Sequence, residues 1–341
     1  MSQSYELPHY FEYDSVAVRP TTRVWLKHVL FLGITFCTST IAGVVPPFGP
    51  GIPFPPLELP AWSDTALFLS WVPTLYSLFV VDVIYHLVTI PSMLIYGMSF
   101  SVPLLIILIS HEMGHYVACR LYGVDSTLPY FIPTPPLIGP AGTFGAFIRI
   151  RSRIPTRRAI FDIGVAGPIA GFIALLPIAF IGVAIMQTTP PGMPIPPDTL
   201  VFADPLMMKA IGLLFGKDMS LGVGNPFYFA AWMGLLVTAL NLIPSGQLDG
   251  GHAMFAALGA RVHAWTGKIA FVVMAVLSIM GMLIYQSPAG FLIAILLGVM
   301  MRIPHPEPWD NTPLDAKRRV VAVLTLVIFI LCFVPFPIRI T

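Results

Sequence analysis

Charged side chains are scarce in this sequence of 341 residues: Asp, Glu, Lys and Arg make up 10% of it, whereas 56% of the residues are hydrophobic. Soluble domains carry about 25% charged and about 45–50% apolar residues. Together with a mean hydropathy of +0.84, this composition excludes a soluble enzyme. The formal net charge is only +2, so the chain lacks the strong basic field that holds nucleic acid, and we expect no nucleic-acid partner.

Paired cysteines are also lacking. Cys37, Cys119 and Cys332 lie far apart inside apolar runs, with no C-x-x-C spacing. The sequence therefore indicates neither a disulfide framework nor a thiolate metal site. Residues 1–23 contain three acids and three tyrosines, which is the wrong composition for a cleaved signal peptide. We interpret them as a retained extramembrane tail.

Long apolar runs occupy most of the remaining chain. A helix that crosses a bilayer needs about 20 such residues. The pattern predicts an all-α polytopic membrane protein, embedded in the lipid bilayer, with about six to eight transmembrane helices. The runs cover residues 24–45, 65–90, 93–121, 159–186, 227–244, 265–286, 288–302 and 319–338.

The segment 123–158 differs in kind from these runs. Five prolines in its first half exclude a regular helix. Residues 147–154 then alternate between apolar and polar side chains, which is the period of a strand. We predict a small membrane-associated β-element here. An irregular basic loop is the alternative, because the sequence does not identify a partner strand.

The positions of Lys and Arg predict the orientation in the membrane. If the six later runs alternate, twelve basic residues between Arg120 and Arg319 fall on one side and three, Lys209, Lys217 and Arg339, on the other. The first side should be cytosolic, or the stromal or matrix equivalent. The basic flank around Arg23 fits less well, because two crossings before the third run would put it outside. A re-entrant run or a tail that breaks the rule would each explain this.

His111, Glu112 and His115 form an H-E-x-x-H pattern near the end of the third run. Residues four apart share a helix face, so both imidazoles can bind one ion while Glu112 stands beside them. The geometry suits zinc with one open position, where a water of pKa about 7 would give its proton to Glu112. A polar helix end is the plainer interpretation. However, ionisable groups at membrane depth cost on the order of 2.5–3.5 kcal/mol each, and a bound cation compensates for that cost.

A third ligand is required, and Asp249 is the only acid associated with the fifth run. Pro244 and three glycines break the helix there, and unwound backbone at membrane depth is tolerated only in protein or beside a watery cavity. The alternation of the runs places Asp249 on the same side as the histidine pair. His252 is a competing ligand. Asn241 could hold a substrate carbonyl or its oxyanion, or hydrogen-bond to another helix.

These motifs resemble the site-2 protease family of intramembrane zinc metalloproteases, in its prokaryotic and plastid-type branch without a PDZ domain. The H-E-x-x-H pattern matches, and Asn241–Gly250 matches the family's N-x-x-P-x-x-x-L-D-G element. The resemblance covers roughly residues 95–265. It implies that one Zn²⁺ per chain is bound by three residues: His111, His115 and Asp249. It also implies that Glu112 is the catalytic base and that Asn241 positions the scissile peptide.

The region after the H-E-x-x-H helix is similar to the same branch in residues 142–146 and 161–168. In such relatives this region forms a membrane-associated sheet that presents the substrate as an extended strand, by β-addition. The loop 187–226 is too short for a PDZ domain. The resemblance implies that four residues bind substrate: Gly142, Thr143, Phe144 and Gly145.

The predicted function is hydrolysis of a peptide bond in or near a transmembrane helix of a single-pass membrane protein, as in regulated intramembrane proteolysis. A membrane metal-ion transporter is one alternative, but it would not need Glu112 and would carry acidic or His-rich portals, which the sequence lacks. A catalytically inactive, protease-like scaffold is the other, but it would have lost one of the four site residues. Cleavage requires the substrate helix to unwind locally.

We expect an integral, multi-pass protein of a bacterial inner membrane, with its active site near the cytosolic (or stromal) side. The expected parts are an N-terminal tail (1–23), N-terminal membrane helices (24–92), a catalytic core (93–260) and C-terminal membrane helices (261–341). The core comprises the H-E-x-x-H helix, the β-element 123–158, a helix 159–186, an external loop 187–226 and the Asn/Asp motif helix 227–260.

Four further polar or small-residue features are present. Asp82 and His86, four apart in the second run, favour a structural hydrogen-bonded pair over a second metal or proton site. Asp162 is expected to cap a helix or to pair with an arginine. Gly164, Gly167 and Gly171 are spaced for close helix packing. No role follows from the polar segment His305–Asn311, although it resembles a tail motif of some bacterial relatives.

Overall fold

The computed structural model of this chain is a mostly helical bundle with small two-stranded sheets. It describes residues 20–51, 65–190, 192, 196, 199–303, 305, 308 and 310–340. The α-helices are α1 (Thr22–Val44), α2 (Thr65–Thr89), α3 (Pro91–Leu121), α4 (Arg157–Ala184), α5 (Leu206–Leu214), α6 (Pro226–Asn241), α7 (Asp249–Leu258), α8 (Ala260–Tyr285), α9 (Ala289–Met300) and α10 (Ala316–Cys332). The strands are β1 (Tyr130–Pro133), β2 (Thr143–Phe147), β3 (Gln187–Thr188), β4 (Leu200–Phe202), β5 (Gly222–Val223) and β6 (Ile338–Ile340).

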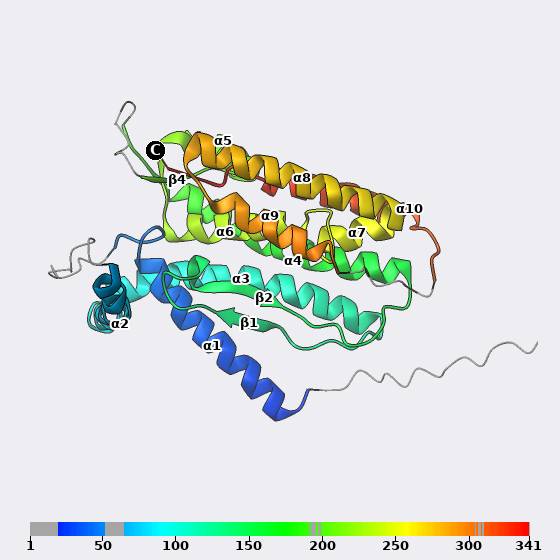
Figure 1. Cartoon of the computed structure of the whole chain (residues 1–341), viewed down its shortest axis with the longest axis horizontal. Coiled ribbons are helices and arrows are strands. Elements are labelled where there is room, and N and C mark those ends of the chain that lie inside the picture. The colour runs from blue at the N-terminus through cyan, green and yellow to red at the C-terminus, as the bar shows by residue number, and fades with distance from the viewer. Residues whose placement is uncertain are drawn as a thin grey trace, which may run out of the picture.

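The two longest apolar helices, α3 and α4, form the centre of the bundle. α3 begins with Pro91, at a position where the missing N–H of proline breaks no helical hydrogen bond. α4 begins after Thr156, whose side-chain oxygen accepts a hydrogen bond from the backbone N–H of Ala159. α6 packs against both helices and α1 covers α3, whereas α8 and α9 form an outer layer (Figure 1). Leu104, Leu175 and Trp232 fill the centre and are almost fully buried.

The membrane class predicted from the sequence is confirmed. Among the described residues, α1, α2, α3, α4 and α8 are long and apolar enough to cross a membrane, and α6 and α9 are shorter apolar helices. Their outward side chains stay apolar, as a lipid-facing surface requires: Leu283 is 79% exposed. The last predicted run is wrong at its end, because α10 stops at Cys332 and residues 338–340 pair with β4 as strand β6. Pro335 and Pro337 cannot donate helical hydrogen bonds there.

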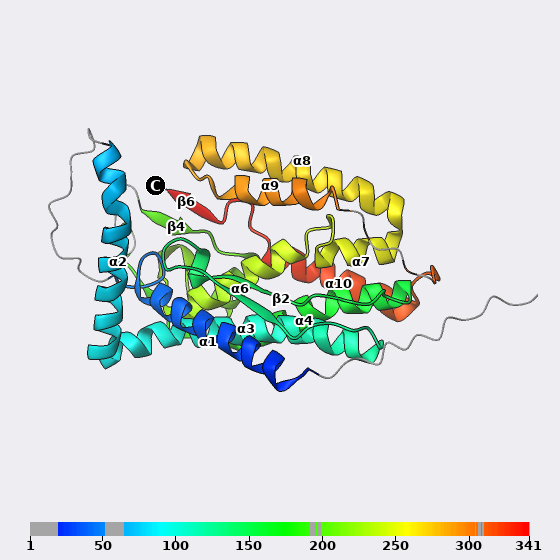
Figure 2. The same cartoon turned by 60° about the horizontal axis from the view of Figure 1, so that its bottom comes forward.

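α2 has an orientation that the hydrophobic pattern could not indicate. Figure 1 shows it end-on and Figure 2 shows it upright beside the horizontal bundle, so it lies across one end of the other long helices. Of the two helices that come before α3 in the chain, only α1 lies along the bundle, and it runs antiparallel to α3. Near the start of α1, Lys27 lies 5.4 Å from the ring centroid of Tyr130 and His28 Nδ1 lies 2.8 Å from the carbonyl oxygen of Pro129. The start of α1 thus lies beside the segment that follows α3.

This arrangement predicts which positions share one side of the membrane. We expect cysteines introduced at Arg23 and Thr312 to react with an impermeant maleimide from one side, and a cysteine at Ser220 to react only from the other. The background should carry Cys37→Ser, because Cys37 is an exposed thiol whereas Cys119 and Cys332 are buried. Labelling in sealed, oriented vesicles measures this. Reaction of the Arg23 and Ser220 positions from the same side would contradict the crosswise placement of α2.

The predicted β-element is present, but its paired strand lies earlier than expected. β1 and β2 are antiparallel, with Tyr130 opposite Phe147. The expectation of a strand over residues 147–154 is therefore wrong beyond Phe147, where the chain forms an isolated bridge between Ile150 and Ser126 and hydrogen bonds to residues 125 and 127. The partner strand comes from the proline-rich stretch and ends at Pro133, where a missing donor does little harm to the ladder.

Polar contacts hold together the end of the bundle at which α3 ends and α4 and α10 begin. Arg318 Nη2 lies 2.7 Å from Asp162 Oδ2, and the Tyr122 hydroxyl donates to the same carboxylate. The expectation that Asp162 pairs with an arginine is thus confirmed. Within α2, His86 Nδ1 lies 3.5 Å from Asp82 Oδ1.

Candidate metal centre

α3 places the two histidines of the H-E-x-x-H pattern on the face that packs against α4. His111 and His115 are 3% and 6% exposed, and one helical turn separates them. The backbone carbonyl of Ile163, in α4, lies 2.7 Å from His115 Nδ1. A carbonyl can only accept, so Nδ1 carries the proton and Nε2 keeps its lone pair free for a metal ion.

Asp249 reaches the histidines because the chain breaks and reverses after α6. Residues 242–248 form turns, with Gly246 at φ +54°, and Asp249 is the first residue of α7. The reversal is tight: a Cβ on Gly250 would lie 2.1 Å from the Leu242 carbonyl oxygen, and one on Gly251 would lie 2.4 Å from that of Gly246. Glycine is therefore required at both positions to bring this carboxylate to α3.

The three candidate ligand atoms form a nearly equilateral triangle. His111 Nε2 and His115 Nε2 are 3.2 Å apart, and each lies 3.3 Å from Asp249 Oδ2. Tetrahedral zinc with bonds of about 2.0–2.1 Å separates its ligand atoms by about 3.3 Å. Among the described residues, these three form the group that could hold a metal ion. The donor set and spacing therefore fit zinc, and His252, the competing ligand, is not part of the group.

Glycines of α4 leave space for the ligand side chains. A Cβ built on Gly167 would lie 2.0 Å from His115 Nε2, and one on Gly171 would lie 3.1 Å from His111 Cβ. On the same face, a Cβ on Gly164 would lie 2.9 Å from His252 Cβ. The small-residue spacing expected to serve helix packing therefore also shapes the metal centre.

Glu112 lies beside the metal group without joining it. It is 6% exposed and lines a cavity of about 910 Å³ together with the three candidate ligands, Asn241 and His252. Residues 146–154, at the end of β2 and beyond it, also line the cavity, and the backbone N–H of Ile148 faces the Glu112 carboxylate. A carboxylate in this position can exchange protons with a molecule in the cavity.

Asn241, at the end of α6, also reaches the group. Its Nδ2 lies 3.2 Å from His111 Nε2, so the side chain contacts a second helix and lines the cavity at the same time. This position is compatible with both sequence-based interpretations, a hydrogen bond between helices and a contact to substrate.

The four residues predicted to bind substrate lie at the start of β2 and do not line the cavity. Gly142 accepts a hydrogen bond from the Thr38 hydroxyl of α1, the Thr143 hydroxyl donates to the Ile132 carbonyl, and Phe144 is 59% exposed. The residues that follow them line the cavity instead. A substrate-binding role for Gly142–Gly145 stays a prediction.

Sequence reasoning missed one contact of the site. His305, in the segment to which no role was assigned, places Nε2 2.8 Å from Nδ1 of His252, and its ring stacks on Phe255 at 4.0 Å between centroids. His305 therefore contacts α7, the helix that carries Asp249. Only the histidine content of 305–311 could have suggested this, since the two histidines are 53 residues apart.

The family model described as "Peptidase family M50" matches residues 99–284. "Probable zinc metalloprotease EGY2, chloroplastic" of Arabidopsis thaliana is 29% identical over 237 residues, 68% of this chain and 40% of the relative. "Probable zinc metalloprotease EGY1, chloroplastic" of the same plant is 28% identical over 240 residues, 67% of this chain and 41% of the relative. This chain thus spans about two fifths of the length of these relatives. No solved structure matches it.

Proposed function

The chain belongs to peptidase family M50, and we propose that it is an intramembrane zinc metalloprotease. Its substrate would be a single-pass membrane protein, cleaved at a peptide bond in or near the transmembrane helix. The relatives named as zinc metalloproteases support this proposal. The single observation that carries it is the triangle of His111, His115 and Asp249 with a carboxylate, Glu112, beside it in the same cavity.

We assign the zinc ligands to His111, His115 and Asp249. Bound zinc would supply a water of pKa about 7 and would polarise the scissile carbonyl. Glu112 would take the proton of the attacking water and pass it to the leaving amine. Asn241 would donate its amide N–H to the carbonyl oxygen of the substrate.

Substrate would enter the cavity in an extended conformation. Backbone groups in a helix are already hydrogen-bonded, so the scissile segment has to unwind before its carbonyl is accessible. Gly142–Gly145 begin the strand whose continuation lines the cavity, which supports a role for them in guiding an unwound segment by β-addition.

The metal centre would face the cytosolic or stromal side of the membrane. Basic residues are concentrated in the loops at the end where α3 ends and α4, α8 and α10 begin, and such loops stay on that side. The apolar helices support an integral, multi-pass protein. The relatives are named chloroplastic, so the expectation of a bacterial inner membrane gains no support from them.

Cleavage by the purified full-length chain tests the proposal. Reconstituted with zinc in lipid vesicles, the protein should cleave a single-pass reporter within or next to its transmembrane segment. A chelator should stop the reaction and added Zn²⁺ should restore it, because the ligand triangle supplies no catalysis without its ion. Mass spectrometry of the fragments locates the cut. Zinc crossing the vesicle membrane with no cut in any reporter would contradict a protease and favour a transporter.

A further inference from the structure

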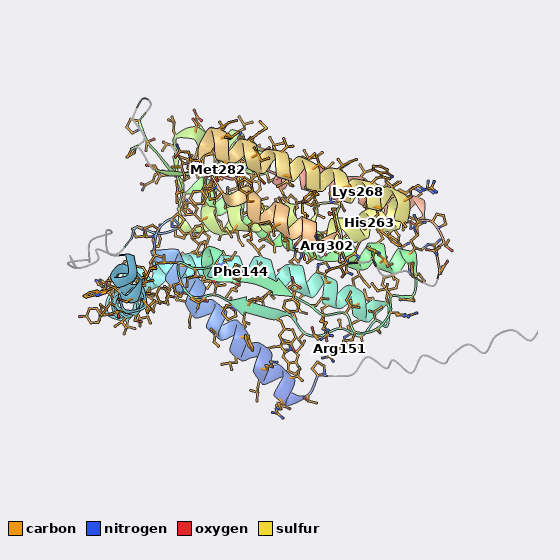
Figure 3. All side chains as sticks on the ribbon, in the orientation of Figure 1. Phe144, Arg151, His263, Lys268, Met282 and Arg302 are labelled. Atoms are coloured by element: carbon orange, nitrogen blue, oxygen red, sulfur yellow. The ribbon has the colours of Figure 1, made fainter. Side chains whose placement is uncertain are left out.

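Three arginines stand at alternate positions on the wall of the catalytic cavity. Arg149, Arg151 and Arg153 lie in the segment that continues β2, and all three are exposed and line the same cavity as Glu112 and the metal group. Figure 3 labels Arg151 beyond the end of β2. Three positive charges are therefore carried by residues that line this cavity.

The backbone of this segment is anchored on one edge. Arg149 N–H donates to the Thr127 hydroxyl at 2.9 Å, Thr127 N–H donates to the Arg149 carbonyl at 3.0 Å, and Arg151 N–H donates to the Asp125 carbonyl at 2.8 Å. Between the arginines, Ile148 and Ile150 pack against a buried cluster that includes Ile154. Alternate residues of an extended chain point to opposite faces, so burying the isoleucines directs the arginines outward.

Among the residues that the structure describes, acidic side chains leave these arginines largely unneutralised. Arg151 Nη1 is 3.9 Å from Asp125 Oδ2, but Asp125 is shared with Arg120 at 3.6 Å. Within the described part of the chain, Arg149 and Arg153 make no ion pair within 4.0 Å. The acids that line the cavity are Glu112 and Asp249, which the proposed function assigns to the metal centre. An anionic group beside Arg149 or Arg153 would thus meet a guanidinium group that makes no ion pair with the described residues.

We propose that this rim of Arg149, Arg151 and Arg153 selects substrates with carboxylates at alternate positions in the flank next to the cleavage site. The inference rests on the proposed function and names its substrate class. Alternate residues of an extended chain are about 6.6 Å apart, so acids two apart in an extended flank match arginines two apart on the wall. Guanidinium groups bind carboxylates with two parallel hydrogen bonds.

The rim also predicts which membrane proteins would not be cleaved. Most transmembrane helices carry Lys or Arg on their cytosolic flank, and the rim repels such flanks. Anionic lipid headgroups are the competing ligand for cytosolic arginines. A peptide is favoured because the three residues line the cavity that holds the proposed base, where a scissile segment has to lie.

Three reporters test the proposal. They share one transmembrane segment and differ only in the flank, which carries three Glu, three Gln or three Lys at alternate positions. With the zinc-loaded full chain in phosphatidylcholine vesicles, we expect kcat/KM to fall in that order, by about tenfold from Glu to Lys, since each exposed pair contributes little. The Arg149→Gln, Arg151→Gln, Arg153→Gln variant should abolish this spread. Substitution of the same three residues by Glu should invert the order.

A matched control removes three charges from elsewhere at the same end of the bundle. Arg261→Gln, Lys268→Gln and Lys317→Gln change exposed residues that do not line the cavity, and the spread should persist. Figure 3 labels Lys268 on the outer layer formed by α8. If the rim variants misfold, raising the salt from about 50 mM to about 500 mM should still compress the spread of the wild type, because screening weakens exposed pairs.

Several outcomes would overturn the inference. Equal cleavage of the three reporters by the wild type removes the rim preference while leaving the protease intact. If the rim substitutions change kcat/KM equally for all three reporters, and only in vesicles that contain anionic phosphatidylglycerol, the arginines bind lipid headgroups instead. Loss of the spread in the control variant shows a general charge effect. Failure of the wild type to cut any reporter overturns the protease and, with it, the rim.

Discussion

Replacing Glu112 with glutamine is expected to leave zinc bound at one ion per chain and to lower cleavage of a transmembrane reporter by about 10²–10⁴-fold. The amide has the size of the carboxylate but cannot accept the proton of an attacking water. Glu112 lies outside the triangle of candidate ligands, so the substitution removes no metal ligand. Zinc content by elemental analysis and fragment formation by mass spectrometry, on the same reconstituted sample, measure both halves of the prediction.

Asp82→Asn is the matched control for this experiment. It makes the same change from carboxyl to amide within another apolar helix, α2, where Asp82 pairs with His86, and it should cleave like wild type. Full activity of Glu112→Gln would remove the assigned base. Loss of zinc together with activity would instead make Glu112 part of the metal site, and the ligand triangle would no longer account for the centre.

The geometry of the candidate metal centre was predictable because it depends on local spacing. His111 and His115 are four apart in an apolar run, and any helix places such residues on one face. Asp249 is a more distant candidate ligand, but it was the only acid associated with its run, and the alternation of the runs predicted that it lies on the same side as the histidines. The structure brings these atoms to within 3.3 Å of one another, as zinc requires.

The elements that the sequence could not place depend on contacts between distant segments. The partner of β2 is a proline-rich strand whose own pattern argues against pairing. α2 has the length and composition of a crossing helix, and composition does not record that it lies across the bundle end. His305 contacts His252 across 53 positions, and no periodicity relates the two.

Gly167→Ala is expected to weaken zinc binding at least about 100-fold and to abolish cleavage, although it adds a single methyl group. The added Cβ would lie 2.0 Å from His115 Nε2 and 2.4 Å from Cδ2, so the imidazole must leave its place between α3 and α4. Displacing a group that merely orients a ligand costs about 10–100-fold in metal affinity, and here the ligand atom itself is displaced. Zinc affinity by competition with a chelating dye, and cleavage at saturating zinc, measure the two effects.

Substitutions of two other glycines serve as controls for Gly167→Ala. Gly33→Ala, in α1, adds the same methyl to a helix where no atom lies within 4 Å, and it should keep zinc and activity while testing for any general effect of alanine. Gly171→Ala would meet His111 Cβ at 3.1 Å, a distance that a small shift can relieve, and it should give an intermediate loss. The loss of zinc affinity should therefore be largest for Gly167→Ala, smaller for Gly171→Ala and absent for Gly33→Ala. Wild-type zinc affinity in Gly167→Ala would mean that His115 does not lie against α4 in the active protein, and the ligand triangle would have to be rebuilt.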